Sequence, residues 1–340
     1  MFCRTAFTGD FVVIVKLLLP ACLLAVVGCS DLHQLRSDNP LLPIREYEQM
    51  IVGRLDADYV GDENCLGKCH SHQPIHDDFR RSVHGEQIAS DTGLPLVNCE
   101  SCHGPGSLAV KDVGSNKEDK CKFDTLLQLE QLPAPAQSLI CLKCHSASST
   151  PVLTYWNAGT HANNDVSCFD CHALHLGPQQ KVSRKEMDAM CFKCHPEVRA
   201  EFAQFSHHPV PEHKMACIDC HEPHGSAQDH LLRGLTRKDT CTRCHMEYQG
   251  PFVFEHADLN EDCGNCHASH GSPNRPLLKS SQPFLCMQCH SGHLGEHVPS
   301  LEENNPAMKG AFHSRCTDCH SSIHGTDVPS SRGRGTFIAR

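Results

Sequence analysis

Cys217-Ile218-Asp219-Cys220-His221 decides how this chain folds, because it holds two thiols and an imidazole within five residues. Two cysteines separated by two residues, with a histidine directly after, form the attachment site of a c-type haem. The thiols add to the two vinyl groups of the porphyrin, and the histidine becomes the proximal ligand of the iron. His224, three residues further on, is placed to reach the iron of a haem close by.

The motif recurs along the chain. Nine segments have the pattern C-x-x-C-H, and a tenth, which begins at Cys65, has one extra residue between its cysteines. Gly67 in this longer motif can adopt the positive φ angles that a bulged loop needs, so we count it as a haem site. Zinc ribbons and disulfide frameworks also use paired cysteines, but neither requires histidine at the next position. The predicted attachment cysteines are Cys65 and Cys69, Cys99 and Cys102, Cys141 and Cys144, Cys168 and Cys171, Cys191 and Cys194, Cys217 and Cys220, Cys241 and Cys244, Cys263 and Cys266, Cys286 and Cys289, and Cys316 and Cys319.

The composition indicates a core supplied largely by cofactors. The 340 residues include 24 cysteines and 27 histidines, whereas only 6% are aromatic. Side chains alone would hardly offset the entropy lost on folding, so we predict ten covalently bound haem c groups and a largely unfolded apoprotein. The predicted fold class is a multihaem cytochrome c, an elongated haem-packed array with short helices, long loops and little or no β-sheet. The formal net charge of −10 argues against a nucleic-acid partner.

The N-terminal residues predict export. Residues 17–27 form an apolar run that is too short to span a bilayer but fits the core of a secretory signal. Val26-Val27-Gly28-Cys29 resembles a bacterial lipobox, which predicts that Cys29 becomes the lipidated first residue of the mature protein. Cleavage without a lipid is the alternative. Ser30, after the lipid site, favours anchoring at the outer membrane.

The motifs fall into pairs, and the later pairs repeat at about fifty residues. Such self-similarity marks a stacked array in which each unit contacts mainly its neighbours. In each pair the first motif mostly carries a basic residue before its second cysteine, whereas the second motif mostly carries Asp or Asn there. The predicted divisions are a signal peptide with lipobox (1–28), a tether (29–60), an N-terminal pentahaem half (61–200), a C-terminal pentahaem half (201–328) and a flexible tail (329–340).

Each iron needs a proximal ligand and can take a distal one. The predicted proximal ligands are the motif histidines His70, His103, His145, His172, His195, His221, His245, His267, His290 and His320. Histidines that recur at fixed places around the motifs are the predicted distal ligands, namely His84, His161, His175, His208, His224, His256, His270 and His324, with His293 as the ninth. His297 is the rival of His293, and His207 competes with His208.

A tenth distal ligand is harder to find. Gly104-Pro105-Gly106 follows the motif at Cys99, and no histidine comes after it before the next motif. The candidates for this haem are His76, which we predict, and otherwise His72, His313 or the unassigned Cys121. If none of them binds, the haem of this motif is five-coordinate.

This ligand set determines the expected chemistry. An iron with two histidines has no open position for a substrate, so it exchanges electrons and does little else. The methionines show no recurring register with the motifs, and the chain has no C-x-x-C-K segment of the kind that holds the active haem of multihaem nitrite reductases. We therefore predict an electron-transfer protein that is not an enzyme and has no catalytic residues.

From about residue 60 to residue 329 the chain resembles the MtrA/PioA/DmsE-type decahaem cytochromes of bacterial outer-membrane electron conduits. The resemblance rests on the haem count and spacing, on the Trp156–His161 and Gly250–Gly271 stretches, and on the last motif at Cys316. It implies a wire threaded into an outer-membrane β-barrel porin. Electrons would pass between periplasmic electron-carrier cytochromes and an extracellular multihaem cytochrome or mineral.

Two other functions remain open from the sequence. The protein could be a lipid-anchored periplasmic electron shuttle, or the donor subunit of a terminal reductase. It could also be a multihaem reductase that acts at one open haem, the one beside Gly104-Pro105-Gly106.

Overall fold

The computed structural model describes residues 52–70, 73–114, 121–176, 182–256, 262–290 and 314–329. The chain forms two units, Met1–Met50 and Ile51–Arg340, and the described residues all belong to the second. The predicted signal peptide, the lipidation site at Cys29 and most of the tether lie outside the described residues. The proposed divisions of the chain therefore stay predictions.

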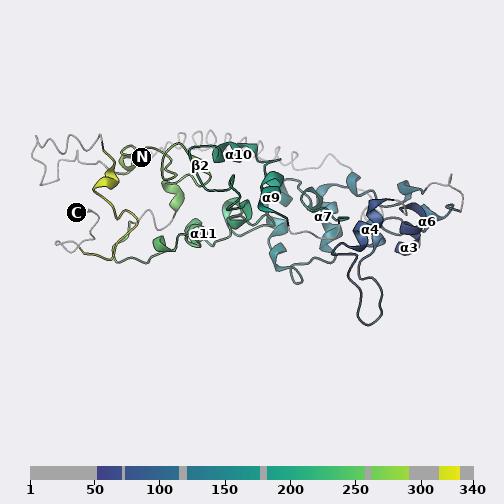
Figure 1. Ribbon diagram of the computed structural model, residues 1–340. Coiled ribbons are helices and arrows are strands. Elements are labelled where there is room, and N and C mark those ends of the chain that lie inside the picture. Colours follow the sequence, from purple (N-terminus) through teal and green to yellow (C-terminus); the bar gives the residue numbers. More distant parts are fainter. Residues whose placement is uncertain are drawn as a thin grey trace, which may run out of the picture. The chain divides into compact units, whose positions relative to one another are not determined.

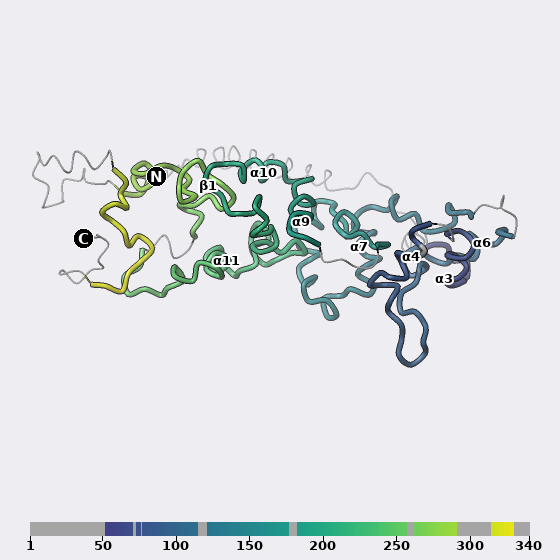
Figure 2. Tube along the Cα trace, in the orientation of Figure 1, coloured from purple at the N-terminus to yellow at the C-terminus, as the bar shows by residue number. Residues whose placement is uncertain are grey.

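Helices in the described part are short and are joined by long irregular segments (Figures 1 and 2). Local sequence starts several of them, since α4, α7 and α10 have proline in the first turn and α9 and α11 begin with a capping box. No helix among the described residues has both the length and the hydropathy needed to cross a membrane. The α-helices are α3 (Asp62–Asn64), α4 (Pro74–Arg80), α5 (Cys99–His103), α6 (Ser107–Val110), α7 (Ala134–Leu142), α8 (Thr160–Asn163), α9 (Arg184–Cys191), α10 (Pro196–Phe202) and α11 (Arg237–Thr242).

Many connections contain a single tight turn. One of these, η2 (Cys65–Cys69), is a π-helical turn. The others are 3₁₀ turns, namely η3 (Phe123–Thr125), η4 (Leu129–Gln131), η5 (Pro151–Leu153), η6 (Trp156–Ala158), η7 (Cys168–Asp170), η8 (Cys217–Asp219), η9 (Asp229–Leu231), η10 (Met246–Tyr248), η12 (Cys263–Asn265), η13 (Cys286–Gln288) and η16 (Cys316–Asp318).

The described sheet is minimal. Strands β1 (Ser206–His207) and β2 (Gly271–Ser272) pair antiparallel, with Ser206 opposite Ser272 and His207 opposite Gly271. Strand β1 lies between the motifs at Cys191 and Cys217, and β2 lies between the motifs at Cys263 and Cys286. The pairing therefore joins segments of successive motif pairs.

Few apolar side chains are buried in the described part of the chain. Those that are buried are Leu66, Ala109, Val110, Leu127, Ile140, Trp156, Phe202, Val210, Ala216, Leu278 and Leu285. They are spread along the sequence and do not form the continuous apolar core of an ordinary globular domain. Short helices, little sheet and repeated haem motifs confirm the predicted class, a haem-packed multihaem cytochrome c.

Candidate haem-binding sites

We number the motifs 1 to 10 in chain order and call motifs 1 and 2, 3 and 4, and so on, motif pairs. In the regular motifs a backbone hydrogen bond closes the turn from the histidine to the first cysteine. The N–H of His145 donates to the carbonyl of Cys141 over 2.9 Å, and the N–H of His221 donates to Cys217 over 3.0 Å. This turn places the proximal imidazole beside the thiols, as attachment to one porphyrin requires.

Motif 1 keeps this closure despite its extra residue. The N–H of His70 donates to the carbonyl of Cys65 over 3.1 Å, and the five residues Cys65–Cys69 form the π-helical turn η2. Gly67 does not have the positive φ that the sequence suggested. The wider turn absorbs the extra residue, which is the usual way that an insertion enters a helical turn.

The first cysteines of the two motifs in a pair face each other. The Cys141 thiol donates a hydrogen bond to Cys168, and this bond lowers the pKa of the Cys168 thiol to about 6. The same contact lowers the pKa of Cys191 and of Cys263 to about 7. The five facing pairs are Cys65 and Cys99, Cys141 and Cys168, Cys191 and Cys217, Cys241 and Cys263, and Cys286 and Cys316.

The second cysteine of an even motif lies near the first motif of the next motif pair. Burial raises the pKa of Cys102 and of Cys220, and the nearby thiols of Cys144 and Cys244 raise it further. Contacts within pairs and between pairs thus alternate along the described chain. Consecutive motifs are neighbours in space in the order of the sequence.

Eight motif histidines face a second histidine at nearly constant distance. The ring centroids lie between 5.8 and 6.3 Å apart in all eight pairs. The pairs, with the motif histidine first, are His103 and His175, His145 and His84, His172 and His224, His195 and His161, His221 and His270, His245 and His208, His267 and His324, and His290 and His256.

This spacing fits an iron held between two imidazoles. Metal–imidazole bonds of about 2 Å on each side of an iron separate the two ring centroids by roughly 6 Å. Several Nδ1 atoms already donate to backbone carbonyls, as in His161 to Pro223 at 2.9 Å and His208 to Ser269 at 2.6 Å. Such hydrogen bonds orient a metal-binding imidazole ring and leave its Nε2 for the metal. The residues present therefore fit haem iron.

Burial keeps these imidazoles in the form that binds a metal. It lowers the pKa of His103 and of His172, and their partners His175 and His224 lower it further. Burial likewise lowers the pKa of His267. A neutral imidazole has the free lone pair that an iron needs, so the surroundings favour ligation over protonation.

All eight of the repeat histidines in the described residues thus lie opposite a motif histidine. His293, His297, His72 and His313 lie outside the described residues, and the side chain of His76 is not described. His207 is engaged at both ring nitrogens, with the carbonyl of Gln204 at 2.6 Å and with Glu212 at 3.1 Å. That arrangement leaves His208, the predicted ligand, as the one that faces His245.

Motif 2 differs from the prediction. We expected the haem at Cys99 to lack a repeat ligand, but His103 faces His175 at 6.0 Å with an angle of 18° between the rings. The sequence search looked near motif 2, whereas His175 comes from the next motif pair. A signal was present, because a histidine follows every later even motif at a similar distance.

Motif 1 also departs from the prediction. Cys69 forms a disulfide with Cys121, and a sulfur in a disulfide has no S–H to add to a vinyl group. This pairing competes with the predicted thioether at Cys69, which stays a prediction. Sequence reasoning missed this bond because Cys121 lies far along the chain and belongs to no motif.

Comparisons with known proteins agree with the haem-attachment motifs predicted from the sequence. Residues 161–200, 207–250 and 256–294 match the family model for a doubled CXXCH motif, and residues 109–173 match that for cytochrome c554 and c-prime. The multihaem cytochrome MtrA of Shewanella baltica (strain OS185) is 34% identical over 231 residues, 68% of this chain and 66% of that protein. The chain belongs to the MtrA-type multihaem cytochromes. It spans just under two thirds of the length of this relative.

The three matches to the doubled CXXCH model begin at equivalent points of the repeat in this MtrA-type cytochrome. Each begins at or next to a distal histidine and contains an even motif followed by an odd one. The facing pair of the odd motif lies within one match, as for His161 and His195. The even motif instead faces a histidine from beyond its own match, as for His172 and His224. The facing histidines therefore link successive repeats of this chain.

The residue directly before the second cysteine has different structural roles in even and odd motifs. In even motifs the acidic residue caps the turn, since Asp219 accepts from the N–H of Ala216 over 2.8 Å. In odd motifs the basic residue reaches back to the preceding even motif. Lys143 donates to the carbonyl of Ser101 over 2.9 Å, and Arg243 donates to that of Asp219 over 3.2 Å.

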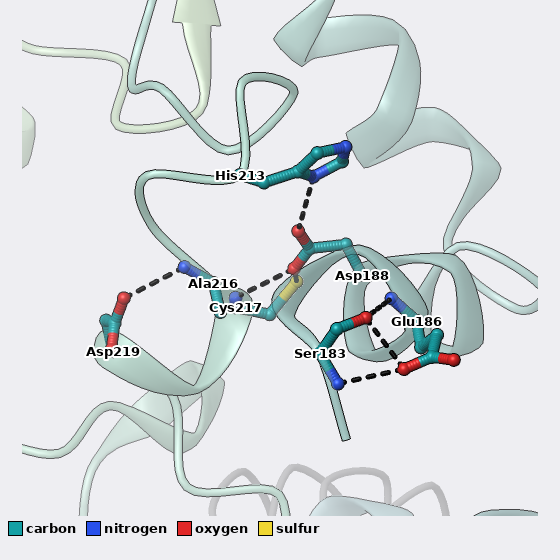
Figure 3. A network of polar contacts seen from close by, with 7 residues as sticks. All are labelled: Ser183, Glu186, Asp188, His213, Ala216, Cys217 and Asp219. Atoms are coloured by element: carbon teal, nitrogen blue, oxygen red, sulfur yellow. Dashed lines mark hydrogen bonds and ion pairs between the residues drawn. The ribbon is translucent and has the colours of Figure 1, made fainter. Parts of the chain in front are cut away.

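A buried carboxylate also fixes the even motif of a pair. Asp188, on α9, accepts from the N–H of Cys217 over 3.3 Å and lies 3.9 Å from His213 (Figure 3). Asp62 has the equivalent place before motif 1, where it accepts from the N–H of Cys99 over 2.7 Å. The residue three positions before an odd motif thus positions the first cysteine of its partner motif.

Proposed function

We propose that this chain is a decahaem electron-transfer wire. The observation that carries the proposal is the set of eight facing histidine pairs, which interlock neighbouring motif pairs in sequence order. When bound, each haem supplies a one-electron centre of low potential if both axial ligands are histidines. The protein residues fix the order of the centres and occupy the open coordination positions.

The continuous series of contacts between consecutive motifs supports electron transfer along the chain rather than catalysis at one site. Thiols of Cys102 and Cys144, and of Cys220 and Cys244, bring the motifs of successive pairs close together. First cysteines do the same within each pair. A series of closely spaced centres has a path for electrons in either direction, so the direction of flow depends on the donor and the acceptor.

We further propose the setting that the resemblance implies. The wire would be anchored through lipidated Cys29 at the outer membrane and held in an outer-membrane β-barrel porin. Periplasmic electron-carrier cytochromes would exchange electrons at one end, and an extracellular multihaem cytochrome or a mineral at the other. The Shewanella relative is a multihaem cytochrome, which supports electron transfer in general.

Native-mass analysis of the protein, extracted in detergent from its host outer membrane, tests this setting. A haem-positive complex with a large β-barrel is expected, and liposomes that hold the complex should pass electrons to an enclosed acceptor. A lipidated monomer without a barrel would contradict the conduit and favour a periplasmic shuttle or a donor subunit. The mass of the mature N-terminal peptide tests whether Cys29 carries a lipid. In a second test, Cys29→Ala should release the chain from the membrane.

A further inference from the structure

Motif 1 has the regular arrangement at its first cysteine. The Cys65 thiol accepts a hydrogen bond from the Cys99 thiol, and the first cysteines of the other motif pairs are also in contact with each other. His70 Nδ1 lies 2.7 Å from the side-chain oxygen of Gln73, so its Nε2 is left for a metal. One attachment thiol and one axial imidazole are therefore in place.

The segment Cys121–Phe123 changes the rest of this site. Cys121 holds Cys69 in a disulfide, and the ring of Phe123 lies 5.8 Å from that of His70. In the eight facing pairs, this separation belongs to the second histidine. Phe123 therefore lies at the separation from His70 that a distal histidine has in the other pairs, and a phenyl ring cannot bind iron.

Backbone contacts hold this segment in position. The N–H of Lys122 donates to the carbonyl of Ala109 over 3.1 Å, and the N–H of Leu127 donates to that of His103 over 2.9 Å. The second bond ties the segment to the histidine of motif 2. Phe123 is therefore placed by the same motif pair whose first haem site it covers.

The pattern of facing histidines along the chain explains why motif 1 differs from the other motifs. Odd motifs face a histidine from the preceding motif pair, as His145 of motif 3 faces His84, which precedes motif 2. Even motifs face a histidine from the following pair, as His103 faces His175. All eight facing pairs among the described residues involve other motif histidines, so none of these pairs supplies a ligand for the iron of motif 1.

We propose that the haem of motif 1 is attached through Cys65 alone, is bound axially by His70 alone, and takes small uncharged diatomic ligands on the face covered by Phe123. The Cys65 S–H adds across one vinyl group, with sulfur on one carbon and hydrogen on the other, and the second vinyl group stays intact. Cys69 and Cys121 lose two protons and two electrons to a partner disulfide, which becomes a dithiol. This inference rests on the proposed haem loading of the chain.

Peptide mapping of the holoprotein tests the single attachment. Lys68 lies between Cys65 and Cys69, and Lys143 lies between Cys141 and Cys144. Cleavage after lysine and arginine should leave haem on the peptide with Cys65 and none on Cys69–Arg80, which should stay joined to Cys121 by the disulfide until a thiol reductant is added. Motif 3 is the internal control, since its two peptides should stay joined through the porphyrin. A porphyrin that joins the Cys65 and Cys69 peptides would overturn the proposal.

Carbon monoxide tests the open face. The reduced holoprotein should bind carbon monoxide, and Phe123→His should lower the uptake by one equivalent per chain and convert one ferric haem from high spin to low spin. Phe284→His is the matched control, because Phe284 is 67% exposed and should leave the uptake unchanged. No uptake by the wild type, or equal uptake by Phe123→His, would overturn the proposal. If these tests fail while the chain carries covalent haem, only the inference on motif 1 is overturned and the proposed electron-transfer function stands. A chain without covalent haem would contradict both the inference and the proposed function.

Discussion

The ring of His103 lies 6.0 Å from that of His175, although the two residues belong to successive motif pairs. Their rings are nearly parallel and lie at the separation expected for the two ligands of one iron. The same relationship recurs along the described chain. Each motif pair thus depends on its neighbours for part of its iron coordination, and this dependence interlocks the array.

Replacement of His175 should open the haem of motif 2. In His175→Ala, one haem per chain should become high-spin in the ferric state, and carbon monoxide uptake should rise by one equivalent over the wild type. Electron paramagnetic resonance and a carbon monoxide titration measure these changes. His207→Ala is the control, because the ring nitrogens of this histidine contact the carbonyl of Gln204 and the carboxylate of Glu212 instead of a motif histidine. Unchanged spectra in His175→Ala would show that His175 is not the ligand.

Asp188 should contribute measurably to the free energy of unfolding. It is 3% exposed and accepts from the N–H of Cys217, so Asp188→Ala leaves a buried donor without its acceptor. We expect the free energy of unfolding to fall by about 1.5–3 kcal/mol. Lys185→Ala, on the exposed side of the same helix, should change it by less than about 0.5 kcal/mol. Denaturant titration of both holoproteins makes the comparison, and equal midpoints would refute the role given to Asp188.

Gly225 should tolerate no side chain. Its φ is +119°, and an added Cβ would lie 2.5 Å from the carbonyl oxygen of Tyr155. Gly225→Ala should therefore destabilise the holoprotein by about 1–3 kcal/mol in thermal unfolding. Gly67→Ala is a useful contrast, since a Cβ there would meet nothing within 4 Å. It should be neutral or slightly stabilising, and a loss as large as that of Gly225→Ala would count against the turn described for motif 1.

Arg243 should contribute only modestly to the link between motif pairs. Its guanidinium donates to the carbonyl of Asp219 on the exposed surface, so Arg243→Met should cost about 0.5–1 kcal/mol of unfolding free energy. Lys193 has the same position in motif 5, but within the described part of the chain its ammonium makes no such hydrogen bond to a preceding motif. Lys193→Met should therefore have a smaller effect, and a reversed order would contradict the assigned link.

The chain should need haem to fold. Few apolar side chains are buried in the described residues, and the motif turns alone bury little surface. Chain produced without haem attachment should show a largely disordered far-ultraviolet circular dichroism spectrum and no cooperative thermal transition. The haem-loaded protein should unfold cooperatively, and a cooperative apoprotein would disprove the dependence.

Local chemistry was predictable from the sequence because it is encoded within a few residues. The motif at Cys217, with its adjacent His221, specifies a covalent haem and its proximal ligand without reference to the rest of the chain. Repeat spacing also singled out His208 over His207, and the structure places His208 opposite His245. Short helices and scarce strands followed from the composition.

Partnerships across the chain required the tertiary structure. The sequence shows that His175 is a ligand type in a repeating place, but only the packing of successive motif pairs brings it to His103. The disulfide between Cys69 and Cys121 and the position of Phe123 against His70 are decided in the same way. Covalent attachment depends on residues a few bonds apart, whereas axial ligation depends on which distant segments lie within about 6 Å, and that is a property of the folded chain.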